Sequence, residues 1–152
     1  MRSIALIVHI TGVIFGYGPG FASPYLASAL GKDETSARAV EPILARIQGT
    51  VTNVGQALLV GGAVWLIFIE HWKPFFRDRW LFSAIVVYLL SGIVAVMIIR
   101  APATKVRRAL LDSGGWGTEA WKKAVRAELI AGGVDVVAVI TLLTLMVWKP
   151  SL

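Results

Sequence analysis

Four long apolar runs dominate the sequence and limit the folds that the chain can adopt. They cover residues 4–30, 51–69, 81–99 and 129–148. A helix needs roughly 20 apolar residues to cross a bilayer, and the last three runs approach that length without a Lys or Arg. We therefore predict an all-α integral membrane four-helix bundle that forms a single transmembrane domain over residues 1–152. The first run exceeds one span, which predicts a tilt, or a bend at Gly18-Pro19-Gly20.

The composition supports the same protein class. Of the 152 residues, 57% are apolar and 16% are charged, whereas about a quarter of an ordinary soluble domain is charged. The sequence has no cysteine, which excludes disulfides, thiolate metal sites and cysteine catalysis. Because the net charge of +6 is confined to the connections between the runs, we predict the lipid bilayer, and no nucleic acid, as a partner.

The distribution of Lys and Arg predicts the orientation of the chain. Four spans place both termini and the middle connection on one side, with five Lys and Arg, and the first and third connections on the other, with ten. The positive-inside rule therefore predicts a cytoplasmic location for the first and third connections and an outside location for both termini. A bacterial-type inner (plasma) membrane suits this pattern.

Two connections also show helical patterns. Residues 34–47 alternate charged and apolar side chains, which predicts a short amphipathic helix in the first cytoplasmic loop, starting afresh at Pro42. In the third connection, Gly114-Gly115 indicates a break. Thr118 then suits an N-cap for a helix that continues into the fourth span.

Polar side chains inside spans are costly, so they are the first functional candidates. By depth, Asn53, Gln56 and Asp135 lie at a similar level near the cytoplasmic side, with Tyr17 as a further donor. We predict that they form a polar cluster. It would act either as a proton or cation relay through Asp135 or, as we favour, as hydrogen-bonded contacts between the second and fourth helices.

The first run contains two further candidates. Gly12, Gly16 and Gly20 recur every four residues, which predicts a smooth stripe for close helix packing. His9 faces the same way, into the bundle. It could be a haem ligand, alone or with His71, or a copper ligand together with Met146. It could equally donate a hydrogen bond to a neighbouring backbone or to Ser83.

Several short motifs resemble the CopD-like superfamily of small integral membrane proteins, which includes copper-resistance proteins and membrane protoporphyrinogen oxidases. They are His9-Ile10-Thr11-Gly12, Phe21-Ala22-Ser23-Pro24-Tyr25-Leu26, Arg79-Trp80-Leu81, Tyr88-Leu89-Leu90-Ser91-Gly92 and Met146-Val147-Trp148-Lys149-Pro150. The resemblance implies a four-helix bundle with an inward histidine. The functional lysine of the oxidases is absent from Phe82-Ser83-Ala84-Ile85, so the chain is most similar to the uncharacterised predicted-integral-membrane-protein branch, and we do not expect that enzyme activity.

Three functional hypotheses follow. The first is a non-catalytic accessory or assembly component that packs against other membrane subunits or a second copy through the glycine stripe. The second is a protein that handles haem b or copper through His9. The third is a small transporter or proton channel that uses Asp135. Because so few polar groups lie in the spans, we favour the first.

Overall fold

The computed structural model describes residues 1–71 and 79–148, and these residues form helices with no strand. The first long helix is α1 (Arg2–Lys32). The second consists of α2 (Glu34–Arg46), the π-helical η1 (Ile47–Thr52), α3 (Asn53–Leu66) and the π-helical η2 (Ile67–His71). The third joins α4 (Arg79–Gly92), the π-helical η3 (Ile93–Arg100) and α5 (Ala101–Asp112), and the fourth is α6 (Glu119–Trp148).

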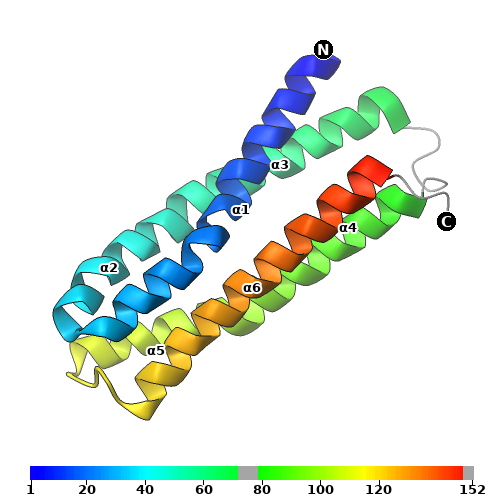
Figure 1. Ribbon diagram of the computed structural model, residues 1–152. Coiled ribbons are helices and arrows are strands. Elements are labelled where there is room, and N and C mark those ends of the chain that lie inside the picture. Colours follow the sequence, from blue (N-terminus) through cyan, green and yellow to red (C-terminus); the bar gives the residue numbers. More distant parts are fainter. Residues whose placement is uncertain (72–78, 149–152) are drawn as a thin grey trace.

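Each of the four long helices is apolar enough, over enough residues, to cross a membrane. The helices alternate in direction, so the N-terminus and the end of α6 lie at one end of the bundle, and α2 and α5 lie at the other (Figure 1). α1 packs against α3 and α6, and α6 packs against α4. The predicted all-α bundle with four spanning helices is confirmed.

The connections differ from the prediction. The predicted amphipathic helix exists as α2, but it begins at Glu34 rather than at Pro42, and it continues through η1 into α3 without a break. Asp33 provides the start signal, because its side chain accepts a hydrogen bond from the Ser36 backbone N–H at 2.7 Å. Pro42 is accommodated inside the helix.

The third connection is also largely helical. α5 continues directly from η3 to Asp112, a turn with positive φ at Gly114 and Gly117 follows, and α6 begins at Glu119. Thr118 caps α6 as predicted, since its Oγ1 accepts a hydrogen bond from the Trp121 backbone N–H at 3.3 Å. The four helices therefore extend as a compact bundle beyond the predicted spans at this end.

α1 runs unbroken through Pro19 and Pro24. The helix is therefore continuous across Gly18-Pro19-Gly20, where a bend was one of the two predicted outcomes, and its excess length extends toward α2. Neighbouring helices satisfy backbone groups freed by proline in membrane proteins, so an uninterrupted helix is acceptable here.

Two apolar clusters hold the bundle together at different levels. One is formed by Tyr17, Leu59, Ala84, Val139 and Leu142. The other lies toward the α2 and α5 end and is formed by Leu30, Ala37, Leu44, Leu111 and Trp121. Along α6, Trp121 and Leu142 are separated by 21 residues, or about 30 Å of helix, and the charged residues described below lie between them.

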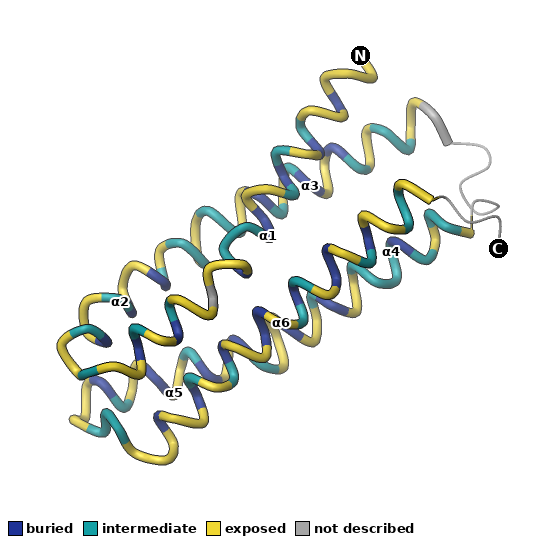
Figure 2. Tube along the Cα trace, viewed as in Figure 1, coloured by how far each residue is buried: buried dark blue, intermediate teal, exposed yellow. Residues whose placement is uncertain are grey.

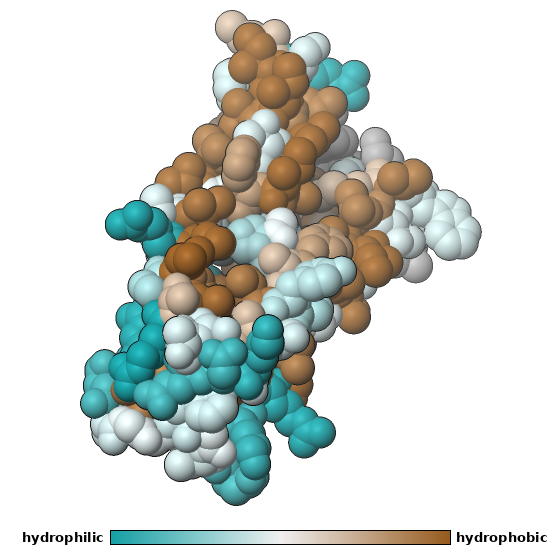
Figure 3. Space-filling view, turned by 60° about the vertical axis from the view of Figure 1, so that its left-hand side comes forward, coloured by the Kyte–Doolittle hydropathy of each residue, from teal (hydrophilic) through white to brown (hydrophobic). Residues whose placement is uncertain are grey.

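The outer surface is divided in the way a membrane protein requires. Many large apolar side chains on α1, α3, α4 and α6 are exposed, among them Ile14, Val64, Leu89 and Ile140, while buried positions line the helix interfaces (Figure 2). In Figure 3, hydrophobic residues cover most of the upper part of the molecule, and hydrophilic residues gather at the α2 and α5 end. This pattern fits an apolar belt in lipid and a polar extension in water.

Candidate functional site

The most unusual feature of the bundle is a set of buried charged side chains between the two apolar clusters. Two are arginines seven residues apart, Arg100 at the end of η3 and Arg107 in α5. Two are acids seven residues apart on α6, Glu128 and Asp135. Seven residues make about two helical turns, so each pair lies on one face of its helix. The two faces meet across the α5–α6 contact.

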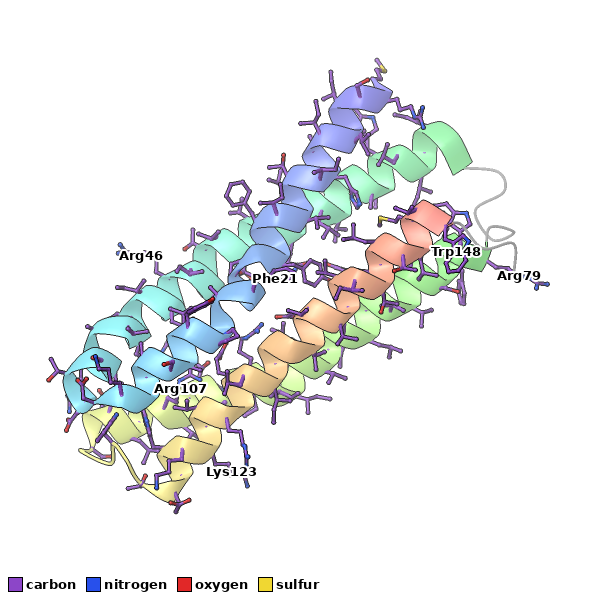
Figure 4. The ribbon with its side chains drawn as sticks, viewed as in Figure 1. Phe21, Arg46, Arg79, Arg107, Lys123 and Trp148 are labelled. Atoms are coloured by element: carbon purple, nitrogen blue, oxygen red, sulfur yellow. The ribbon has the colours of Figure 1, made fainter. Side chains whose placement is uncertain are left out.

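Within the bundle these four side chains alternate in charge. Arg100 donates from Nη2 to Asp135 Oδ2 at 2.8 Å and from Nε to Glu128 Oε1 at 3.1 Å. Arg107 donates from Nη1 to Glu128 Oε2 at 3.3 Å. Glu128 and the side chain of Arg107 are fully buried, and Figure 4 shows Arg107 between the helices.

The N-terminal half of the chain completes the network. Arg107 Nε donates to Glu41 Oε2 of α2 at 3.0 Å, and Gln48 of η1 donates to Glu128 Oε1 at 3.0 Å. The other Glu41 oxygen lies 3.6 Å from Nε of the half-exposed Arg108. We call the six charged residues the ionic ladder, namely Asp135, Arg100, Glu128, Arg107, Glu41 and Arg108.

The ladder is electrically balanced. Three arginines face three acids, and both carboxylate oxygens of Glu128 accept hydrogen bonds. Removing charges from water is expensive, and close pairing with several hydrogen bonds is what offsets that cost. The arrangement therefore fixes α2, η1, η3, α5 and α6 relative to one another, and it turns its charges toward each other rather than toward an open site.

The inner end of the ladder lies against α1. A Cβ added at Gly20 would lie 3.0 Å from Cβ and 3.1 Å from Oδ2 of Asp135. Gly20 is therefore the residue that lets α1 cover the Asp135–Arg100 pair. A larger side chain at this position would displace the carboxylate or separate the helices.

The predicted cluster of Asn53, Gln56 and Asp135 is not the arrangement in the structure. The Asp135 carboxylate pairs with Arg100. Gln56 accepts from Tyr88 Oη at 2.7 Å and donates to the Gly16 carbonyl at 3.3 Å. Asn53 is exposed and donates to the Gly49 carbonyl. Depth along the helices does not show that Arg100, at the end of η3, reaches back to Asp135.

The ladder was missed because its arginines were counted as loop charges that determine topology. Glu41 and Glu128 lie outside the four apolar runs, so their positions in the sequence do not indicate that they are buried. A signal does exist in the sequence, since Arg100 and Arg107 match the seven-residue spacing of Glu128 and Asp135. The seven-residue spacing places each pair on one face of its helix, so two such faces of opposite charge can lie against each other.

His9 lies buried between α1 and α3, with 8% of its surface exposed. Its Nδ1 is 3.0 Å from the Leu59 carbonyl oxygen, so the hydrogen bond goes to a neighbouring backbone, one of the two arrangements predicted. Met146 is half-buried near the end of α6. The side chain of His71 lies outside the described residues, and among those described no group of three or more His, Asp or Glu is arranged to hold a metal ion.

The glycine stripe is covered within the chain itself. A Cβ at Gly12 would overlap the Leu59 backbone, and one at Gly16 would lie 3.0 Å from Gln56 Nε2. On the facing helix, a Cβ at Gly55 would overlap the Gly16 backbone. The stripe thus lets α3 and α6 approach α1. The assembly hypothesis required the stripe to be a free face for another subunit, and the structure contradicts that part of it.

Comparison with known proteins gives one match. The family model described as predicted integral membrane protein (DUF2269) matches residues 3–150, nearly the whole chain, and it does not itself connect the chain to the CopD-like superfamily. No curated protein and no solved structure matches significantly. With four membrane-length helices and a match over almost its full length, the chain belongs to this family of predicted integral membrane proteins.

Proposed function

We propose that the protein is a non-catalytic accessory or assembly component of a bacterial-type inner membrane, which packs against other membrane subunits or a second copy. The ionic ladder carries this proposal. Its buried charged side chains pair with one another, and these pairs connect helices from both halves of the chain. A scaffold needs such a fixed shape, whereas an acid–base catalyst needs an acid or base that is open to a substrate.

The exposed surface supports the same role. Large apolar side chains are exposed along every long helix, and in a membrane such surfaces contact lipid or the helices of partner subunits. We also propose the orientation predicted from the sequence, in which the α2 and α5 end lies in the cytoplasm.

Cross-linking in native membranes, followed by native mass spectrometry of the purified full chain, tests the proposal. We expect a complex larger than one chain. The contact face can then be mapped with Gly61→Leu on α3, Gly92→Leu on α4 and Gly133→Leu on α6, because nothing lies within 4 Å of an added Cβ at these positions. A single unassociated chain under all conditions would overturn the proposal.

A second candidate function rests on His9. A carbonyl oxygen only accepts hydrogen bonds, so Nδ1 must carry the proton in its bond to Leu59. With the proton on Nδ1, Nε2 is the ring nitrogen whose lone pair can bind haem iron or copper. This candidate agrees with the resemblance of the His9 segment to the CopD-like superfamily.

An absorption spectrum tests the second candidate. Protein purified from cells supplied with haem should show a Soret band that His9→Ala abolishes, and protein supplied with copper should bind it in a His9-dependent way. A colourless, copper-free preparation would exclude it. The matched control is Asn53→Ala, since Asn53 is an exposed polar residue on α3 whose hydrogen bond stays within its own helix.

Transport through Asp135 remains a prediction. Its test compares the ion flux of liposomes that contain the parent chain with that of liposomes that contain Asp135→Asn. Pairing of Asp135 with Arg100 supports a structural role for this carboxylate. Flux that disappears in Asp135→Asn while the variant remains folded would favour the transport hypothesis instead.

A further inference from the structure

The ionic ladder changes the charge of the molecular surface as well as the interior. Glu41, Glu128 and Asp135 are buried acids, so their charges are removed from the outer face of the extension. Two acids that remain exposed lie close to a cation of their own helix. Glu34 pairs with Arg38 and Glu119 pairs with Lys122, each at 2.7 Å.

Among the residues that the structure describes, the exposed cations without an acidic partner include four on α2, α5 and α6. We call these four the basic collar: Arg46, Lys105, Lys123 and Arg126. Figure 4 shows Arg46 and Lys123 projecting away from the bundle, in contrast to Arg107 between the helices.

The collar lies close to the edge of the apolar belt. Counted along the helices at 1.5 Å per residue, Arg46 and Arg126 are about 5–8 Å from the ends of the second and fourth apolar runs, and Lys105 and Lys123 are about 9 Å away. The acids Glu34, Asp112 and Glu119 lie about 15–25 Å away by the same count. Cations without acidic partners therefore occur at headgroup depth, and exposed acids lie beyond it.

We infer that the basic collar binds the phosphate groups of anionic lipids in the membrane leaflet on the α2 and α5 side. The charge complementarity is direct, since each collar cation lacks a protein counter-charge at the depth where lipid phosphates lie. Arginine suits this role because its planar fork can bind a phosphate through two donors. Arg107, which the sequence groups with Lys105 and Arg108, is excluded because it is fully buried in the ladder.

The experiment measures lipid selectivity of the reconstituted full chain. Electron paramagnetic resonance gives the relative association of spin-labelled phosphatidylglycerol and spin-labelled phosphatidylcholine with the protein in phosphatidylcholine bilayers. We expect a preference for phosphatidylglycerol that weakens with added salt. The double variant Arg46→Gln/Arg126→Gln should reduce it, by up to about fivefold for each cation removed.

The control is Lys122→Gln, which removes one cation from the same helix as Arg126 at a position paired with Glu119. It should keep the selectivity of the parent. Arg46→Lys/Arg126→Lys should restore most of the preference, which separates charge from folding defects. Equal association of both lipids with the parent, or an equal loss in Lys122→Gln, would overturn the inference and indicate an acidic protein partner or a general charge effect.

Discussion

Glu128 is the residue on which most of the ladder depends. It is fully buried and accepts hydrogen bonds from Gln48, Arg100 and Arg107, which belong to three different elements. A carboxylate in this position is stabilised only by its partners, and each arginine depends on it in turn. The residue is therefore a structural contact point between both halves of the chain.

Replacing Glu128 tests this dependence. Glu128→Leu leaves two buried guanidinium groups with fewer counter-charges, and we expect a loss of about 3–5 kcal/mol in unfolding free energy. Denaturation in mixed micelles, followed by circular dichroism, measures the change. Glu119→Leu on the same helix is the control, since its exposed pair with Lys122 contributes little to stability. Equal stability of the two variants would contradict the role assigned to the ladder.

Asp33 makes a pH-dependent contribution at the turn between α1 and α2. Hydrogen bonds from the backbone N–H and the hydroxyl of Ser36 hold the pKa of its carboxyl below the ordinary value of 3.8. A depressed pKa in the folded state means that the cap stabilises α2 fully above that ordinary value. The stabilisation is lost as the pH falls through the lowered pKa.

We therefore expect the first turn of α2 to open in acid. Hydrogen exchange at the Ser36 amide, corrected for the intrinsic rate, should lose protection as the pH falls below about 4. Asp33→Asn retains an acceptor oxygen and should show protection independent of pH. Identical pH profiles for the parent and Asp33→Asn would show that the carboxyl is not the titrating cap.

At the scale of the elements, the fit between α1 and α3 depends on glycines. Gly12 faces the Leu59 backbone, and Gly55 faces the Gly16 backbone, so neither position has room for a methyl group. Close backbone approach of this kind replaces the hydrophobic driving force that helices lack in lipid. It also brings the Leu59 carbonyl within reach of His9.

Alanine substitutions distinguish covered from open glycines. Gly12→Ala should destabilise the bundle by about 1–3 kcal/mol, because the added methyl group forces α1 and α3 apart. Gly61→Ala, on α3 with open space around it, should be neutral or slightly stabilising, since alanine favours helix more than glycine. Thermal unfolding of both variants in the same detergent gives the comparison, and a destabilised Gly61→Ala would show that this face is covered.

The helices themselves could be predicted from the sequence more readily than their contacts. Apolar length identifies the four spans, and the Thr118 cap follows from a side chain placed before a helical pattern. The amphipathic pattern predicted α2 but not its unbroken continuation into α3, and α5 was not predicted because it is polar enough to resemble a loop. The ladder was hidden because its partners lie 21–66 residues apart in the sequence. Periodicity describes one helix at a time and does not show which faces meet.

At the scale of the whole molecule, the orientation in the membrane is directly testable. The chain has no native cysteine, so a single introduced cysteine can be labelled without background from other thiols. Ser113→Cys, exposed in the turn before α6, should react with an impermeant maleimide only from the cytoplasmic side. Ser3→Cys, exposed near the start of α1, should react only from outside. Labelling of both positions from the same side would contradict the alternating arrangement of the helices.

The order in which the ladder residues are synthesised has a consequence for insertion. Arg100 ends the apolar part of the third long helix, and both carboxylates that neutralise it, Glu128 and Asp135, belong to α6. While the ribosome is still making α6, neither of these carboxylates is present, so we expect Arg100 to remain at the water-facing edge of the bilayer. We therefore expect α6 to complete the insertion of the third helix as well as to add a fourth span, because it supplies the carboxylates that pair with Arg100.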